Sequence, residues 1–292
     1  MRRILAIGIV AGLTWAGLLL APPSVARTTK VQRPEASMLV LGSLTVGSDG
    51  RVVGHTLDDV AQLPAPVVDV IDRNMARWQF QPVVRDGHAV TARSQMSLRV
   101  VAQPSGQHDY VLSIRGVHFG DSRNGRGGLV RNIDPEYPPQ AMAAHVAGTV
   151  YLALRIDAQG RVQDVATEQV DLRYLGNNWQ MERYRKLLGR AAERAAHGWL
   201  FEPLRAGQAA VARYAMVPVV FDIHVSGVPG MPSDGPGHWV SYMPGPVKTV
   251  PWFDAPRMLP GLAGDLDALP GQGVYMADPD GSLHLLSKLG GS

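Results

Sequence analysis

The clearest pattern in the chain is an alternation of apolar and polar residues that ends in a glycine turn. Between positions 149 and 156 every second residue is aliphatic, which is typical of a strand with one buried face. A turn that ends in Gly160 follows, and a return strand is predicted over residues 162–170. The aliphatic residues expected to face the core are Val150, Leu152, Leu154 and Ile156.

The same arrangement occurs earlier in the chain. Residues 38–46 alternate in the same way, the turn Ser48-Asp49-Gly50 follows, and a return strand begins at Arg51. Gly50 is expected to take a positive φ, because glycine adopts this conformation without steric cost. Asp49 and its counterpart Asp157 are expected to hydrogen-bond their own backbone, as aspartates in turns commonly do.

Each return strand is followed by a segment with apolar residues at helical spacing, and then by a W-x-F-x-P motif. The motif occupies residues 78–82 and 199–203, and Gly198 is expected to end the second helix in a left-handed conformation. Closing strands are predicted over residues 89–100 and 212–224. The apolar helix positions are Val67, Ile71 and Met75 in the first segment and Met181, Tyr184, Leu188, Ala191 and Ala195 in the second.

These patterns predict an α+β protein with two small β-β-α-β units, each an antiparallel sheet packed on a helix. The predicted division is a signal peptide or N-terminal anchor at residues 1–26, units at 38–102 and 135–224, a linker at 103–134, and a Gly/Pro-rich tail at 225–292. Within the linker, residues 110–119 are compatible with one more strand. Residues 120–131 are interpreted as a flexible linker or as a basic anion-binding loop.

The tail lacks a periodic core pattern up to residue 260 and is expected to be irregular and to follow the surface. Residues 274–277 and 282–286 predict a hairpin, which we expect to add to a domain edge and to block it. Four aromatic residues of the tail either pack over a sheet face or await a partner: Trp239, Tyr242, Trp252 and Phe253.

The N-terminal residues predict export. Arg2 and Arg3 precede an uncharged apolar run at positions 4–21, and Pro22 and Ala26 lie in a segment typical of a signal-peptidase site. The body is therefore expected in the periplasm, either free or anchored in the inner membrane.

Composition narrows the classes of function. The net charge of +3 over 292 residues argues against a phosphate-dominated nucleic-acid binder, and the absence of cysteine excludes disulfides and thiol chemistry. The nine histidines occur without a metal-ligand motif, and no nucleophile–base arrangement is visible, so we expect no cofactor, no metal and no enzyme. Five basic residues are interpreted as a solvated helix face or a contact for an acidic partner or anionic lipid: Arg183, Arg185, Lys186, Arg190 and Arg194.

The second unit resembles the TonB C-terminal domain family, and the first unit resembles it from the hairpin onward. The resemblance rests on an ordered set of short motifs: Tyr137-Pro138 with Ala141, Gly148-Thr149-Val150, Asp157 with Gly160 and Val162, Trp199-Leu200-Phe201-Glu202-Pro203, and Val217-Pro218-Val219. Three features depart from the transducer itself. The apolar leader lacks its serine and histidine, no Pro-rich spacer precedes the first unit, and a long tail follows the second.

The resemblance implies a module that binds an extended peptide at the N-terminus of an outer-membrane receptor, or another envelope partner, by strand addition, in connection with TonB-dependent transport. Where the family often has a glutamine, this chain has Asp134. The residues implied in partner binding are Asp134, Tyr137, Pro138, Met216, Val217, Val219, Phe221 and Ile223. We expect Val219→Pro to abolish binding by removing an edge N–H. The alternative is a structural or oligomerising envelope protein whose sheet edges pair internally or in a homodimer.

Overall fold

The computed structural model describes residues 34–105, 109–120, 128–204, 212–223, 236–271, 273–277 and 283–290. Antiparallel strands and helices are mixed along these residues, which confirms the α+β class. No helix in the described ranges is long and apolar enough to cross a membrane. The predicted leader, most of the Gly/Arg-rich loop and the turn of the predicted tail hairpin lie outside the described residues.

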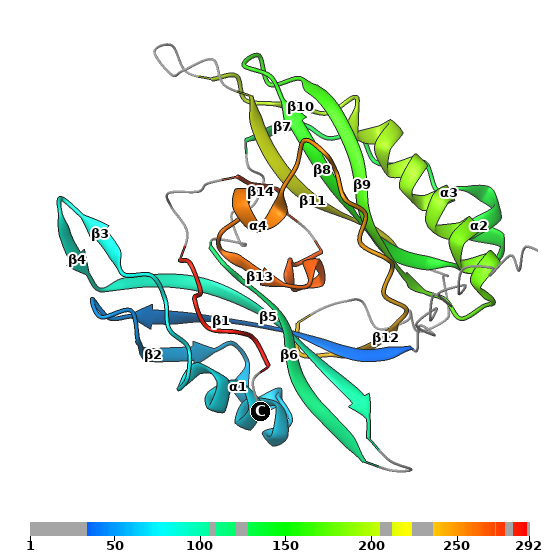
Figure 1. The fold of residues 1–292 in the computed structure, drawn as a ribbon. Helices are drawn as coiled ribbons and strands as arrows, with labels where there is room; N and C mark the ends of the chain where they lie inside the picture. Colours follow the sequence, from blue (N-terminus) through cyan, green and yellow to red (C-terminus); the bar gives the residue numbers. More distant parts are fainter. Residues whose placement is uncertain are drawn as a thin grey trace, which may run out of the picture. The chain divides into compact units, whose positions relative to one another are not determined.

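The first sheet contains β1 (Glu35–Val46), β2 (Val52–Leu57), β5 (Ala92–Pro104) and β6 (Tyr110–Phe119), all paired antiparallel (Figure 1). Between β2 and β5 the chain forms the short helix η1 (Val60–Gln62), helix α1 (Ala65–Met75) and a small hairpin of β3 (Val83–Arg85) and β4 (His88–Val90). The apolar face of α1 is buried in one core with β1, β5 and β6, through Val67, Val70, Ile71 and Met75.

The second sheet contains β8 (Ala147–Ile156), β9 (Val162–Arg173) and β11 (Arg213–Phe221), in the order β11-β8-β9. The short helix α2 (Pro139–Ala143) precedes it, and α3 (Asn178–Ala196) lies between β9 and β11 in sequence. A capping box starts α3, because Asn177 accepts from the Gln180 N–H and the Gln180 side chain accepts from the Asn177 N–H. The apolar face of α3 packs on one face of this sheet.

In both sheets the glycine of the first turn makes the same contact with the segment that follows the helix. Gly50 and Gly160 have φ values of 80° and 83°, and their carbonyl oxygens accept from the N–H groups of Phe80 and Phe201, each at 2.8 Å. A Cβ at either glycine would overlap with the carbonyl oxygen of that phenylalanine, so both turns require glycine. Strand β10 (Leu200–Phe201), which contains the second of these phenylalanines, pairs with β7 (Leu129–Arg131).

The described residues of the tail add short elements to the fold. The expectation of an irregular segment up to residue 260 holds for most of its described residues, but the expectation that it only follows the surface is wrong, because Val250 and Phe253 are buried. The tail forms β12 (Trp239–Tyr242), α4 (Ala255–Met258), β13 (Leu262–Gly264), η2 (Leu266–Ala268) and β14 (Tyr275–Met276). Strands β12, β13 and β14 add to β1, β6 and β11 respectively (Figure 1). The sequence of these three strands shows no alternation of apolar and polar residues. Each strand is held by pairing with a strand that is distant in the chain.

The predicted tail hairpin is also wrong in its pairing. Residues Tyr275 and Met276 pair with Met216 and Ala215 of β11. Leu285 instead forms an isolated bridge with Phe80 in the first half of the chain. The two arms therefore lie on different partners and not on each other.

Strand β8 is buried on both faces, although its alternation predicted one. Val150, Leu152 and Leu154 pack in the core with α3 as expected. The intervening Tyr151 and Ala153 are also buried, in a separate core that they share with Met216 and with tail residues. This second core includes Val250, Phe253, Ala255, Leu259, Leu262, Leu266, Ala268, Leu269 and Tyr275 of the tail.

Gly198 does not have its predicted left-handed conformation, and the predicted linker contains a strand. The helix before Gly198 ends at Ala196, and Gly198 is absent from the positive-φ residues, so its predicted left-handed conformation is wrong. Its small size serves another purpose, because a Cβ there would overlap with the Ile133 side chain. The predicted linker contains β6, as its strand interpretation anticipated, paired with β5 along most of its length.

Candidate functional site

The outer edge of β11 is the place where the sequence implied a partner strand. On its inner side, β11 pairs with β8 over all nine residues from Arg213 to Phe221. On its outer side, in the part of the chain that the structure describes, β14 pairs with only Ala215 and Met216. The C-terminal half of the edge therefore has no strand partner among the described residues.

Strand alternation decides which backbone groups face this edge. The Ala277 N–H donates to the Tyr214 carbonyl at 2.7 Å, so the polar groups of Tyr214 face β14. Because the direction repeats every second residue, those of Met216, Pro218 and Val220 face the same way. The N–H of Val219 points toward β8, so Val219→Pro would break the sheet, and the expectation that it tests edge binding is wrong.

The side chains of the implied β11 residues are mostly buried. Val217, Val219 and Phe221 face the core with α3, and Met216 faces the core with the tail. Ile223 is half-buried beyond the end of β11, where its N–H donates to Asp222 Oδ1 at 3.0 Å. A partner would therefore meet the backbone of this strand and not the side chains implied by the motif.

The Tyr137-Pro138 element packs against the C-terminal end of β11. The Tyr137 hydroxyl donates to the Val146 carbonyl at 2.6 Å, and its ring packs edge-on against Phe221 with centroids 5.4 Å apart. Burial, reinforced by the nearby Asp222, raises the pKa of Tyr137 to about 12. Pro138 is buried at the start of α2, whereas Asp134 is exposed and accepts from the Asn132 side chain at 3.1 Å.

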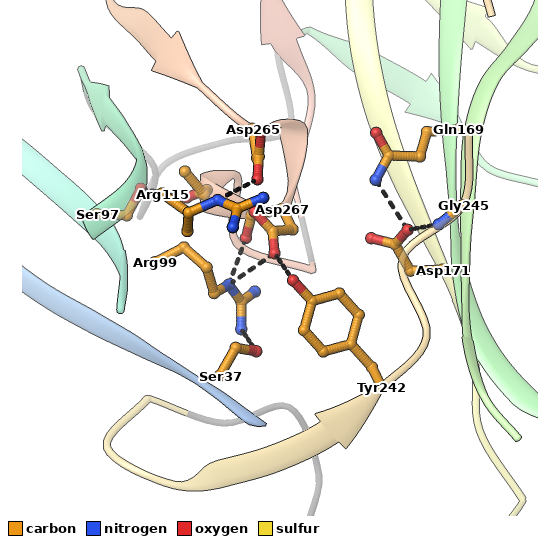
Figure 2. Close-up of polar contacts among 11 residues, drawn as sticks. Ser37, Ser97, Arg99, Arg115, Gln169, Asp171, Tyr242, Gly245, Asp265 and Asp267 are labelled. Carbon is orange, nitrogen blue, oxygen red and sulfur yellow. Dashed lines mark hydrogen bonds and ion pairs between the residues drawn. The ribbon is translucent and has the colours of Figure 1, made fainter. Parts of the chain in front are cut away.

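A buried polar cluster lies where the tail meets both sheets, and sequence reasoning missed it (Figure 2). Arg99 on β5 is 2% exposed, and its Nε donates to the Asp267 carbonyl at 2.7 Å and lies 3.7 Å from Asp267 Oδ2. The Tyr242 hydroxyl donates to the same carboxylate at 2.6 Å. Arg99 Nη1 also reaches the Ser37 hydroxyl at 3.4 Å, so the cluster ties β1, β5, β12 and η2 together.

Asp171 on β9 faces the same interior and is fully buried. Its Oδ1 accepts from the Gln169 amide at 2.8 Å and from the Gly245 N–H of the tail at 2.7 Å (Figure 2). Its Oδ2 has no hydrogen-bond partner among the described residues. Burial, together with the charge of Asp267, raises the pKa of Asp171 to about 7.

Two further charged residues of the second unit are buried against the tail. Arg185 of α3 donates to the carbonyls of Val170, Met243 and Pro244, so its assignment to a solvated basic face is wrong. Its four predicted companions on that face are exposed. Glu168 is 8% exposed, and burial together with Asp254 raises the pKa of its carboxyl to about 7.

The cluster is suited to holding the tail and not to binding a substrate. The cavity between Asp171, Arg99 and Tyr242 has a volume of about 20 Å³, which is close to the size of a single water molecule. Within the described ranges, no group of three or more His, Asp or Glu side chains is arranged to hold a metal ion. The sequence contained one signal, because the apolar Val101 lies on the same face of β5 as Ser97 and Arg99, which indicates that this face is covered as well.

No protein-family model, no curated protein and no solved structure matches the chain.

Proposed function

We propose that this chain is a periplasmic protein-binding module that takes up an extended peptide by strand addition at the outer edge of β11. The single observation that supports the proposal is that β14 pairs with only part of this edge. Strand β14 spans two of its nine residues, and the outward carbonyl of Pro218 and the outward N–H and carbonyl of Val220 lie beyond it. A peptide strand laid along this half would gain backbone hydrogen bonds without a strict requirement for its side chains.

The repeated architecture supports a common origin for the two halves of the chain. Strand, strand, helix and strand occur in this order in β1-β2-α1-β5 and again in β8-β9-α3-β11. The contact between the turn glycine and the phenylalanine after the helix recurs at Gly50 with Phe80 and at Gly160 with Phe201. We interpret the two as copies of one unit related to the TonB C-terminal domain. In the first copy β6 pairs with the closing strand along most of its length, so the second copy is the one proposed to bind.

The partner class follows from the resemblance and from the backbone edge. We propose the N-terminal segment of an outer-membrane receptor, or another envelope protein with an extended segment, and a role linked to TonB-dependent transport. The module carries no catalytic role in this proposal and requires no cofactor.

The test uses a substitution at the outward-facing position. Val220→Pro removes one outward N–H and leaves the bonds to β8 in place, whereas Val220→Ala retains that N–H. A labelled receptor N-terminal peptide should bind the wild type and Val220→Ala chains with similar affinity, and Val220→Pro at least about tenfold more weakly. Equal affinity for all three chains would refute binding at this edge.

A second function, the structural one, is favoured by a different observation. The tail supplies strands to β1, β6 and β11, and its Met243 and Lys248 N–H groups donate to the Leu172 and Glu168 carbonyls at the edge of β9. A protein that covers so many of its own edges is protected from strand exchange and needs no partner. The structural proposal predicts that no receptor peptide binds, and it allows a homodimer, which size-exclusion chromatography would detect.

A further inference from the structure

A groove with a volume of about 390 Å³ lies between β12 and the segment that follows β9. Its walls are mainly aliphatic and aromatic, and its volume falls in the range of about 300–1,000 Å³ typical of ligand sites. It is separate from the outer edge of β11, because no residue of β11 lines it. The side chains that shape it include Leu172, Tyr174, Leu175, Trp239, Tyr242 and Met243.

One end of the groove is closed by a pair of backbone hydrogen bonds. The Leu172 N–H donates to the Met243 carbonyl at 3.1 Å, and the Met243 N–H donates to the Leu172 carbonyl at 2.7 Å. Beyond this bridge, no strand pairing links Tyr174 to Ser241 in the described part of the chain. The two segments thus begin as an antiparallel pair and then separate, which creates the groove.

The β12 side of the groove is an open strand edge. Strand β1 presents the Leu39 and Leu41 carbonyls to the side on which β12 and β2 lie, since these carbonyls accept from Gly237 and Asp58. By alternation, the polar groups of Tyr242 and Val240 face β1, and those of Ser241 and Trp239 face the groove. Ser241 is exposed, and its N–H and carbonyl point toward the groove.

The groove also contains a cation with an unsatisfied donor. The Arg173 side chain is 7% exposed, and it forms an ion pair with Asp222 at 3.3 Å and a hydrogen bond to the Phe221 carbonyl at 3.3 Å. Its Nε–H has no acceptor in the described part of the chain. A buried donor without an acceptor is costly, so a ligand that supplies an oxygen at this position would gain affinity. The exposed imidazole of His145 lines the same groove.

We propose that this groove binds a short extended peptide that carries apolar side chains and ends in a free carboxylate. The outward backbone groups of Ser241 and Trp239 recur every second residue, which matches the spacing of an added strand. The apolar walls accept the side chains, and the Arg173 Nε–H, which has no acceptor while Nη2 is paired with Asp222, provides a hydrogen-bond donor for the carboxylate. A lipid or a small apolar molecule would fill the walls but would leave the β12 backbone unpaired, so a peptide is the better match. The site is independent of the function proposed for β11.

The test is selection from a random octapeptide library with free C termini, using the purified full chain. The Ser241→Pro variant lacks the N–H that faces the groove, and Ser241→Ala retains it. We expect apolar peptides to be enriched on the wild type and on Ser241→Ala, and to bind Ser241→Pro about tenfold or more weakly, as the loss of a backbone hydrogen bond requires. Equal enrichment on all three chains, or none on the wild type, would overturn the proposal.

A second pair of variants keeps the test decisive if Ser241→Pro does not fold. Leu175→Asp places a charge on the groove wall at a side chain that is 65% exposed, and Leu286→Asp makes the same change at 58% exposure away from the groove. Only Leu175→Asp should weaken an enriched peptide. Amidation of the peptide C-terminus should also weaken it by about tenfold, since the Arg173 Nε–H then loses the carboxylate oxygen that accepts from it. Val220→Pro should leave this binding unchanged, which separates this groove from the edge of β11.

Discussion

Replacement of Asp171 by asparagine should stabilise the protein at alkaline pH. In the unfolded chain an aspartate carboxyl has a pKa of about 4, whereas in the folded protein burial raises the pKa of Asp171 to about 7. The folded protein therefore holds a proton that the unfolded chain releases between these pH values. Stability falls as the pH rises through this window, because the folded state binds more protons.

The size of this change in stability follows from the difference between the folded and unfolded pKa values of Asp171. A difference of about three pKa units corresponds to about 4 kcal/mol, which the wild type loses between pH 4 and pH 8. The introduced asparagine cannot ionise, and its amide oxygen can still accept from Gln169 and from the Gly245 N–H. The new amide NH₂ replaces an oxygen without a partner, which costs about 1 kcal/mol at every pH and so cancels in the pH slope.

Urea unfolding at pH 5 and at pH 8 measures this effect. Between these two pH values the expected change is about 2.6 kcal/mol, so with a slope of about 2–3 kcal/mol per molar urea the variant should gain about 1 M in midpoint relative to the wild type. Glu168→Gln should remove a second part of the pH dependence, because burial also raises the pKa of Glu168 to about 7. If Asp171→Asn and the wild type show the same pH slope, Asp171 is ionised in the folded protein and burial does not raise its pKa.

Three further substitutions test individual contacts by urea unfolding. Gly160→Ala should cost at least about 3 kcal/mol, because φ is 83° and a Cβ would overlap with a carbonyl oxygen, while Gly54→Ala, with open space around it, should change stability by less than about 1 kcal/mol. Tyr137→Phe should cost about 1 kcal/mol, since one hydrogen bond to a carbonyl is lost, and no cost would show that ring packing alone holds this residue. Arg185→Met should cost about 2–4 kcal/mol because three carbonyls lose their donor, whereas Arg183→Met on the exposed side of α3 should cost less than about 0.5 kcal/mol.

The parts of the fold that depend on local chemistry could be predicted from the sequence. Gly50 has the positive φ expected of it, and Asp49 and Asp157 accept from backbone N–H groups in their own turns. Strands β8 and β11 lie where alternation placed them, and Trp199 is buried after α3 as a helix-terminal aromatic residue should be. In each case the signal and the structure it predicts involve residues close together in the chain.

The parts that depend on distant segments could not be predicted in this way. Tyr151 and Ala153 alternate with aliphatic residues and were expected to face solvent, yet the tail covers them. Arg99 and Arg185 have the spacing of exposed residues, and both are buried because tail carbonyls accept from them. Alternation shows that two faces of a strand differ, but it does not show what covers the second face. The tail itself shows no helical or strand period in its sequence, since its position is fixed by the strand edges with which it pairs.

These long-range contacts also change what a test of the proposed function must do. Removing the whole tail would expose Met216, Tyr151 and Ala153 and would break the contacts of Arg99, so loss of binding in such a chain would report only unfolding. Ala277→Pro is more selective, because it removes one hydrogen bond from the tail to the Tyr214 carbonyl and leaves the core in place.

The binding and structural proposals make opposite predictions for Ala277→Pro. A peptide that extends from the open half of the β11 edge toward Tyr214 meets β14, so loosening β14 exposes more of the edge and raises the apparent affinity for such a peptide. The gain is limited to the stability of the contact that is lost, which for one hydrogen bond is about 1 kcal/mol, or roughly fivefold in the dissociation constant. If the tail strand is purely structural, the substitution lowers the stability of the chain and produces no binding. A titration of Ala277→Pro and wild type with the same receptor peptide therefore separates the two functions in one experiment.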